Sequence, residues 1–512
     1  MRFWAEDPSD PDNTRNLQPK DLTSLLDSGF INAQRGLDND GHGEADVLGR
    51  VLEQLFLAAR EPNADPKDKG LVEELEKAIE EVQSSLDGSV KGQLDELLPP
   101  LRTFGFGALN DAQLLTETTL DVVRLLSNFT KVRYAGHSGV ALPESYNGLG
   151  VRNLILILMR IVSYYKRFRA SADAPGLQVI FIEEPEAHLH PQMQEVFIRK
   201  LEKLIDDLAA ADGDNVVWPV QFVVSTHSSH VANEAGFESI RYFLCKRSKT
   251  DPKIRHAEVK DLRSGLKSTS HPVRDFLHKY LTLTRCDLFF ADKAVLVEGM
   301  SERLMIPVMI EKLQTGEEDH PEASSQYTTV MEVGGAYAHL FFDLLDFLEL
   351  KTLIVTDLDS VAQEDGEGSF KAVRVHQGSR TSNATIKAWF ADDNPCEIAA
   401  LLAKSAEQKC QKGKRIAYQV ADHETGACGR TFEDAFILRN VQKFGLVGGT
   451  REELEEESAS LASESKKSEF ALVHAITDTD WDTPKYIREG LEWLFANAAD
   501  AQADHSEAPD GN

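Results

Sequence analysis

The sequence lacks a hydrophobic run long enough to cross a membrane. Its best candidate, Leu154–Val162, is interrupted by Arg160, whereas a spanning helix needs about 20 mostly apolar residues in succession. The opening segment MRFWAEDPSDPDNTRN has no apolar stretch of the kind found in signal peptides. The sequence therefore predicts neither a spanning helix nor an export signal.

Cysteine is also scarce. The 512-residue chain contains five cysteines and no CxxC pair. Disulfide frameworks and structural zinc sites both depend on closely spaced cysteines. The wide spacing therefore predicts reduced cysteines in a cytoplasmic protein. The five are Cys245, Cys286, Cys396, Cys410 and Cys428.

The length exceeds what one compact core supports, so two to four domains are expected. The first forty residues are rich in Asp, Asn, Pro and Gly and indicate irregular structure. Helical periodicity follows up to about Leu126, and it is compatible with a helical bundle or with a dimerisation arm. Two polar segments stand apart: Glu452–Ser465 is expected to be a mobile acidic loop, and Ala496–Asn512 a disordered tail.

From Gly148 onward, short apolar segments alternate with helical patterns. This alternation predicts an α/β fold with two successive parallel sheets, each covered by helices on both faces. The expected helices are Glu302–Leu313 and Ala336–Leu348. The expected strands are Val179–Ile182, Val216–Ser225, Ala294–Val297, Thr329–Val333 and Thr352–Thr356.

A first group of polar residues surrounds the earlier predicted sheet. Glu183 and Glu184 end one strand, where they could hold Mg²⁺ and polarise a water molecule, and His227 follows the next strand. Asn147, Gly148 and Gly150 precede an apolar helix, whose N-terminal N–H groups suit phosphate contact. Each piece alone is commonly a solvated turn or a structural histidine. Their order along the chain is what indicates a nucleotide site.

A second group consists of carboxylates in the later sheet. Glu298 and Glu302 lie one helical turn apart after the first strand. Asp357 and Asp359 follow a parallel strand with a spacing that places both on one side of an extended segment. Such oxygen ligands suit divalent ions, and a pair of ions can support phosphodiester cleavage. The alternative is a set of acidic strand ends that simply face solvent.

Both groups carry a family resemblance. NGLG, IFIEEPEAHLHP and STHSSH are similar to the signature loop, the Walker B and D-loop segment, and the switch-histidine loop of ABC-type ATPases in the SMC-like branch. VEGMSE, MEVGGAYAH and TDLD resemble the glutamate, glycine and DxD motifs of a Toprim domain. This layout is identified as that of overcoming-lysogenization-defect (OLD) nucleases, which include relatives of the Gabija nuclease subunit.

The resemblance implies roles for individual residues. Glu183 would be the Walker B acid, Glu184 the catalytic base and His227 the γ-phosphate sensor. GRTFEDAF and KSEFA resemble two later motifs, which implicate Glu433 and Lys467. Two Mg²⁺ or Mn²⁺ ions would be held by the catalytic carboxylates, and Lys467 would stabilise transition-state charge. The implied metal ligands are Glu298, Glu302, Asp357, Asp359 and Glu433.

The resemblance also implies an organisation. Residues 1–45 would be a remnant of the N-terminal ATPase lobe, 46–135 a helical dimerisation region, 136–285 the C-terminal half of the ATPase, 286–495 the Toprim nuclease and 496–512 an acidic tail. A homodimer, a helicase partner and a role in phage defence are further implications of the family.

One departure from the family is large, because no G-x-x-x-x-G-K-[ST] motif occurs. That loop supplies most phosphate contacts in such ATPases, so ATP binding and hydrolysis by this chain alone are left open. A missing N-terminal lobe is the favoured explanation, since the other motifs are intact. Truncation of the protein or degeneration into a scaffold are the alternatives.

Charge bears on the DNA partner. The net charge is −29, from 55 basic and 84 acidic residues, which by itself argues against phosphate binding. However, the stretch Arg241–Lys293 holds 13 Lys and Arg against 6 Asp and Glu. It predicts salt-dependent phosphate contacts with little sequence specificity, unless it is merely a solvated linker.

The leading hypothesis is therefore a metal-dependent DNA endonuclease regulated by an ATPase module. The main alternative is a non-nucleolytic, ATPase-derived scaffold or sensor that binds DNA. A primase or topoisomerase activity ranks last, because those families do not share the ATPase half.

Overall fold

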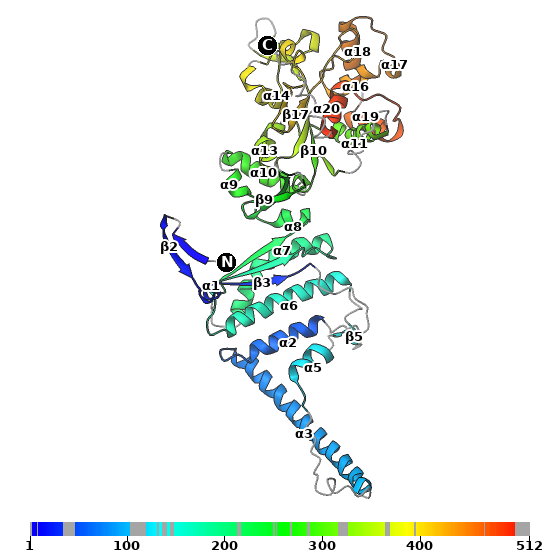
Figure 1. Cartoon of the computed structure of the whole chain (residues 1–512). Helices are drawn as coiled ribbons and strands as arrows, with labels where there is room; N and C mark the ends of the chain where they lie inside the picture. The colour runs from blue at the N-terminus through cyan, green and yellow to red at the C-terminus, as the bar shows by residue number, and fades with distance from the viewer. Residues whose placement is uncertain are drawn as a thin grey trace. The chain divides into compact units, whose positions relative to one another are not determined.

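The computed structural model divides into two compact units, Met1–Glu234 and Ala235–Asn512, each described below by itself (Figure 1). The predicted domain boundaries remain predictions, and the segment after Glu234 groups with the second unit. The residues described are 3–7, 9–33, 47–102, 119–130, 133–135, 141–143, 148–211, 217–248, 251, 253–266, 269–283, 287–315, 326–363, 369–393, 396–464 and 466–496.

The first unit is built on a three-stranded parallel sheet with the order β3 (Leu26–Ile31), β6 (Leu177–Glu183) and β7 (Val220–Ser225). Ile180 and Ile182 point to a core shared with Ile157 of α6 (Leu149–Ala170) and Phe197 of α7 (Pro191–Ala211). Alternate residues of a strand face opposite sides, so the buried isoleucines define the covered face.

The other face of this sheet differs from expectation. Phe30 is 56% exposed and Val223 40% exposed, and Phe30 stacks on Phe181 with ring centroids 4.9 Å apart. Parallel sheets usually have helices on both faces. Among the described residues of the first unit, helices cover only one face, so the prediction of two covered faces was wrong here.

Helices account for most of the described residues before residue 135. α2 (Val47–Ala59) packs on α5 (Val122–Phe129) and α6, and α3 (Pro66–Arg102) extends away from them (Figure 1). The helical pattern was predicted, and α3 continues through Pro99 and Pro100. Leu71 and Val82 of α3 are largely exposed. The dimerisation role remains a prediction.

Two other sequence expectations were wrong. The described part of the first forty residues is not irregular, since it contains β1 (Phe3–Asp7), β2 (Asp10–Leu17), α1 (Pro19–Leu25) and β3. The acidic segment after Thr450 is a helix, α18 (Arg451–Glu464), with Leu454, Glu455, Ser458 and Ala459 buried. Small and polar residues on its buried side hide the apolar periodicity that normally reveals a helix. The tail from residue 497 onward lies outside the described residues.

The second unit contains a five-stranded sheet in the order β11-β10-β12-β17-β16. β11 (Thr328–Glu332), β10 (Lys293–Val297), β12 (Lys351–Val355) and β17 (Lys414–Ala417) are parallel, and β16 (Cys410–Gln411) is antiparallel at the edge. Every residue of β10 is buried. The four parallel strands therefore end at one edge of the sheet. Among them, β10 has a neighbouring strand on each side and is buried along its whole length.

Helices pack on this sheet. α11 (Met300–Thr315), α16 (Phe432–Arg439), α19 (Lys467–Leu472) and α20 (Lys485–Phe495) share a core cluster with Val295, Val297, Leu353 and Val355. An antiparallel sheet of β13 (Ser360–Gln363), β14 (Phe370–Ala372) and β15 (Arg380–Thr381) follows β12. It leads into α14 (Ala384–Trp389). The predicted α/β class is confirmed in both units.

Smaller elements complete the units. In the first they are β4 (Arg133–Ala135), β5 (Ala141–Pro143) and α8 (Ser229–Glu234). In the second they are β8 (Arg241–Arg247), β9 (Arg255–Asp261), α9 (Leu262–Gly265), α10 (His271–Leu283), α13 (Phe342–Leu348), α15 (Ile398–Leu402) and α17 (Val441–Phe444). No helix within the described ranges has the length and apolar character needed to span a membrane.

Candidate active site

Glu298 follows β10, an interior strand of the sheet, and is the most heavily hydrogen-bonded of the predicted carboxylates. Its Oε1 accepts hydrogen bonds from the Thr356 hydroxyl, from the Asp357 N–H at 3.1 Å and from the Asn383 amide at 2.8 Å. Because β10 and β12 are parallel neighbours, their following residues meet at the same edge of the sheet. The structure therefore brings Glu298 and Asp357 together as the sequence predicted.

Asp357 follows β12 and is half-buried. Burial raises the pKa of its carboxyl well above the ordinary value, and the charges of Glu302, Glu298 and Asp359 raise it further. Gln419 acts in the opposite direction, since its Nε2 donates a 2.7 Å hydrogen bond to Oδ1 of Asp357. A buried carboxylate among like charges is costly unless a cation compensates it.

Glu302 occupies the first turn of α11 and is 6% exposed. Burial, followed by repulsion from Glu433 and Glu298, raises the pKa of its carboxyl from 4.5 to about 7. The one-turn spacing from Glu298 was predicted to direct both carboxylates to one place. The mutual repulsion shows that the two carboxylates are close enough to interact.

Glu433 and Lys467 come from distant parts of the chain. The Lys467 Nζ lies 3.1 Å from Oε2 of Glu433, and the Ser301 hydroxyl donates a 2.9 Å hydrogen bond to Oε1. Burial, the largest influence, lowers the pKa of Lys467, but the charges of Glu433, Asp357 and Glu302 together raise it above its ordinary value. The lysine is therefore a stable cation at the edge of an acidic group.

Asp359 differs from the other carboxylates. Its backbone has a φ of 46°, a left-handed conformation that is uncommon for residues other than glycine. The Arg430 guanidinium lies 2.8 Å from its Oδ1. Asp359 thus has a cationic partner within the protein, whereas the charges of Glu302 and Glu298 act on Asp357 and raise its pKa.

Together these six side chains meet at the carboxyl edge of the second sheet. Five of them are carboxylates, whose oxygen atoms are the hard ligands that Mg²⁺ and Mn²⁺ prefer. A bound cation would relieve the repulsion between these carboxylates. As placed, no three His, Cys, Asp or Glu side chains of the described residues form a ready coordination shell. The donor chemistry of the carboxylates fits divalent cations.

The nucleotide-site residues lie in the first unit. Glu184 has a φ of 41°, and the Nε2 of His227 lies 3.6 Å from its Oε1. This proximity follows from the parallel register that pairs Glu183 with Ser225. The structure thus places the predicted base beside the predicted sensor. Asn147 lies outside the described residues.

The predicted glycines, Gly148 and Gly150, lie at the start of α6. Gly148 precedes the first turn of α6, and a Cβ added to Gly150 would approach the His188 carbonyl oxygen to 2.4 Å. Asn153, one turn on, donates a hydrogen bond at 2.7 Å to the Ala187 carbonyl. The N-terminus of α6 therefore packs against the loop that follows the two glutamates, and glycine at position 150 permits this approach.

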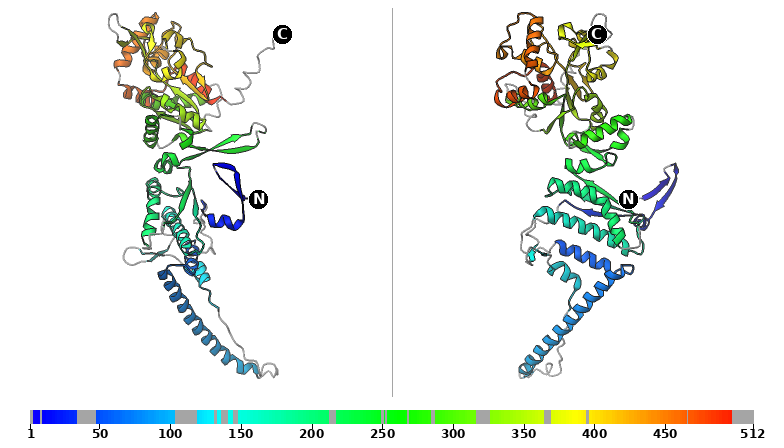
Figure 2. Two further views of the ribbon diagram at one scale, coloured as in Figure 1. Left: turned by 90° about the vertical axis from the view of Figure 1, so that its left-hand side faces the viewer. Right: turned by 180° about the vertical axis from the view of Figure 1, so that it is seen from behind.

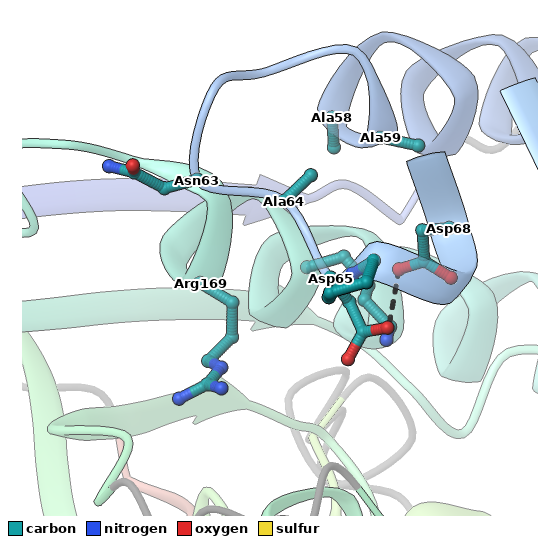
Figure 3. Close-up of a pocket in the computed structure, with 9 residues that line it drawn as sticks. Ala58, Ala59, Asn63, Ala64, Asp65, Asp68 and Arg169 are labelled. Carbon is teal, nitrogen blue, oxygen red and sulfur yellow. Dashed lines mark ion pairs between the residues drawn. The ribbon is translucent and has the colours of Figure 1, made fainter. Parts of the chain in front are cut away.

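A cavity in the first unit is unrelated to either set of residues. It has a volume of about 110 Å³ and lies between the end of α2, the start of α3 and α6 (Figure 3). Asp68 and Lys166 form an ion pair at 3.1 Å in its wall. This local compensation leaves the cavity without a clear charge preference.

The sequence did not point to four residues of the second site. Asn383, Gln419, Ser301 and Arg430 each hydrogen-bond one of the predicted carboxylates. Gln419 follows β17, so its place after a fourth parallel strand was a usable signal. Asn383 begins α14 beyond an antiparallel insertion, and no periodicity links it to Glu298.

Comparison with known proteins identifies two matching domains. Residues 13–232 match the AAA ATPase domain family, and residues 289–359 match the TOPRIM domain of proteins like the overcoming lysogenization defect protein. Endonuclease GajA of Bacillus cereus (strain HuB5-5) is 29% identical over 412 residues, which cover 75% of this chain and 58% of the relative.

Two further comparisons are weaker. OLD nuclease of Thermus scotoductus (strain ATCC 700910 / SA-01) is 28% identical over 235 residues, covering 45% of this chain and 39% of the relative. The chain thus spans less than two thirds of the length of either nuclease. The solved C-terminal region of the Burkholderia pseudomallei OLD protein shares 20% identity and covers 41% of this chain and 98% of that one, with a TM-score of 0.23.

Proposed function

Because the chain joins an AAA ATPase domain to an OLD-like TOPRIM domain and is homologous to endonuclease GajA and to an OLD nuclease, we propose that it is a DNA endonuclease that depends on Mg²⁺ or Mn²⁺. The observation that carries this proposal is the cluster of Glu298, Glu302 and Asp357, in which the Asp357 N–H donates to Glu298 and the neighbouring carboxylates help raise the pKa values of Glu302 and Asp357. Among the described residues, Lys467 is a cation whose charge acts on Glu302, but its ammonium pairs with Glu433 and not with these three.

The proposed catalytic chemistry uses the clustered carboxylates as ligands for metal ions. Glu298, Glu302, Asp357, Asp359 and Glu433 would hold two divalent ions, which when bound supply an activated water and stabilise the leaving oxygen. Lys467 is 69% exposed while its ammonium contacts the buried Glu433. From this position it can stabilise negative charge on the phosphate from the solvent side.

DNA binding is proposed for the hairpin of β8 and β9, which is drawn as the pair of green strands extending sideways in the left view of Figure 2. At its base, Arg241 pairs with Asp261 at 2.9 Å and Lys260 with Glu349 at 2.6 Å. Towards its tip, Lys253 and Arg255 are exposed. Among the described cations of the hairpin, Lys253 and Arg255 form no ion pair, so the proposal places the phosphate contacts of the hairpin at its tip.

The first unit is proposed to be the regulatory ATPase module. Glu183 would bind the nucleotide-associated Mg²⁺, Glu184 would act as base, His227 would sense the γ-phosphate, and Asn147, Gly148 and Gly150 would contact phosphate. The absence of a G-x-x-x-x-G-K-[ST] motif from the sequence leaves ATP use as the least supported part. A homodimer, a helicase partner, a role in phage defence and a cytoplasmic location rest on the resemblance and on composition.

Plasmid nicking tests the central proposal. Supercoiled plasmid incubated with the purified chain and Mn²⁺ is expected to be nicked, and Asp357→Ala is expected to abolish cleavage. Asp392→Ala is the matched control, because Asp392 belongs to a different surface turn. Cleavage by Asp357→Ala at the rate of the unaltered chain would refute the assignment.

The alternative is a scaffold that binds DNA without cutting it. One observation favours it, namely that the described carboxylates do not form a ready coordination shell. The plasmid assay, combined with a measurement of DNA binding at several salt concentrations, separates the two functions. DNA binding that weakens with salt, without cleavage in Mg²⁺ or Mn²⁺, supports the scaffold.

A further inference from the structure

We propose that the side-chain amides of Asn383 and Gln419 position Glu298 and Asp357 so that each carboxylate presents a single oxygen to a metal ion. We call these two amides the amide clamp. This inference rests on the proposed function and extends it to the choice of metal. Neither residue touches the reacting atoms, so both are positioning residues.

The start of α14 holds the Asn383 side chain in one orientation. It is 1% exposed, and its Oδ1 caps α14 by accepting hydrogen bonds from the N–H groups of Thr385 and Ile386 at 3.0 and 3.1 Å. With the oxygen engaged by the helix, the Nδ2 group must face the other way. It donates to Oε1 of Glu298 at 2.8 Å and to the Thr356 hydroxyl oxygen at 3.0 Å.

Gln419 is oriented in the same manner. It is fully buried, and its Oε1 accepts the Leu358 N–H at 2.6 Å. Its Nε2 then donates to Oδ1 of Asp357 at 2.7 Å. The Thr381 hydroxyl donates to the Leu358 carbonyl at 2.7 Å, so the backbone between the two aspartates is held on both sides.

The clamp leaves one oxygen free on each carboxylate. Oε1 of Glu298 already accepts from Thr356, Asp357 and Asn383, and Oδ1 of Asp357 accepts from Gln419. Oε2 and Oδ2 are therefore the oxygens that can face an ion. A carboxylate restricted to one oxygen suits the small octahedral shell of Mg²⁺ or Mn²⁺, whereas Ca²⁺ takes more oxygens and accepts bidentate carboxylates.

The expected consequence is selectivity for Mn²⁺ over Ca²⁺ that depends on the amides. Asn383→Ser retains a residue that can cap α14 but cannot reach Glu298, and Gln419→Met retains the volume but has no donor. Each variant is expected to weaken Mn²⁺ binding by about 10- to 100-fold, the usual effect of losing a partner of a metal ligand. Ca²⁺ affinity should fall less or rise.

The experiment is calorimetric titration of the metal-free full chain with MnCl₂ and, separately, with CaCl₂, with circular dichroism to verify folding. Asn440→Ser is the matched control, because the Asn440 amide also donates two hydrogen bonds, to the Phe436 and Asp482 carbonyls, outside the carboxylate cluster. The control should retain the ratio of Mn²⁺ to Ca²⁺ affinity of the unaltered chain.

The outcomes separate the two proposals. A lower ratio of Mn²⁺ to Ca²⁺ affinity in folded Asn383→Ser and Gln419→Met supports the clamp, and an unchanged ratio overturns it even if stability falls. If Gln419→Met does not fold, Gln419→Glu, which keeps the acceptor for Leu358, replaces it. Selective Mn²⁺ binding without plasmid cleavage would refute the nuclease while leaving the clamp intact, and a chain that binds neither ion refutes both.

Discussion

Arg430 and Asp359 are joined twice. The Arg430 guanidinium lies 2.8 Å from Oδ1 of Asp359, and the Arg430 carbonyl oxygen accepts the Asp359 N–H at 3.3 Å. Arg430 precedes α16, which carries Glu433, while Asp359 follows β12. The pair therefore connects two acidic segments of the proposed catalytic site and holds Asp359 in its left-handed conformation.

Replacing Arg430 should impair this connection. Arg430→Ala is expected to reduce the rate of plasmid nicking about 10- to 100-fold, because Asp359 would lose the partner that fixes its carboxylate. Arg439→Ala is a suitable control, since Arg439 forms ion pairs with Asp422 and Asp482 instead. Nicking rates measured at saturating Mn²⁺ test this, and equal rates for the two variants would count against a role for Arg430.

Lys467 should contribute to the rate rather than to metal binding. Lys467→Ala is expected to lower the maximal cleavage rate by about 10²–10³-fold, the effect typical of losing one charge-stabilising donor. Its neighbour Lys466 is the N-cap residue of α19, so Lys466→Ala serves as the adjacent control. Rates are compared across a range of Mn²⁺ concentrations. A defect in Lys467→Ala that excess Mn²⁺ restores would show a role in metal binding instead.

The metal-free protein should lose stability as the pH rises. The folded-state pKa of Glu302 is raised to about 7, so the folded protein holds this proton more tightly than the unfolded chain does. The stabilising contribution is complete below about pH 4.5 and is lost as the pH passes through about 7, a change on the order of 3 kcal/mol. Thermal unfolding in EDTA at pH 5 and pH 8 measures it.

Two controls accompany this prediction. Glu302→Gln should flatten the pH dependence, because the amide does not ionise. Mn²⁺ should stabilise the unaltered chain more at pH 8 than at pH 5, since binding competes with the proton. A melting temperature that depends on pH equally in Glu302→Gln and the unaltered chain would rule out Glu302 as the source.

The hairpin tip should determine the salt dependence of DNA binding. The double variant Lys253→Ala with Arg255→Ala is expected to reduce the slope of log affinity against log salt by about 2, since each phosphate contact contributes about 0.9. Lys246 and Lys260 both pair with Glu349, so their double alanine variant is the control and should change the slope less. Fluorescence anisotropy with duplex DNA between low and moderate salt gives both slopes.

Much of the second unit was predictable from local pattern. The strands around Ala294–Val297 and Thr352–Thr356 were short apolar runs that ended in acids, and parallel pairing brings such ends together. The proximity of Glu184 and His227 followed from the same rule. These predictions needed only strand identity and direction.

Other features depended on contacts that local pattern does not encode. Asn383 hydrogen-bonds Glu298 across 85 residues, and Gln419 reaches Asp357 across 62. α18 was mistaken for a loop because its burial depends on a charged residue. Glu455 is buried because it accepts hydrogen bonds from the His376 ring and the Arg451 side chain at 2.8 and 2.9 Å. The pattern of hydrophobic residues in the sequence does not predict such pairing.

The order of the catalytic segments along the chain has a consequence for biosynthesis. The proposed site takes its first carboxylates from residues 298–302, its next from 357–359, one from Glu433 and its ammonium from Lys467. A ribosome must therefore release nearly the entire second unit before the site can assemble. A nascent or prematurely terminated chain would carry the acidic strand ends without the ammonium group, so incomplete products would lack the full set of residues proposed for catalysis.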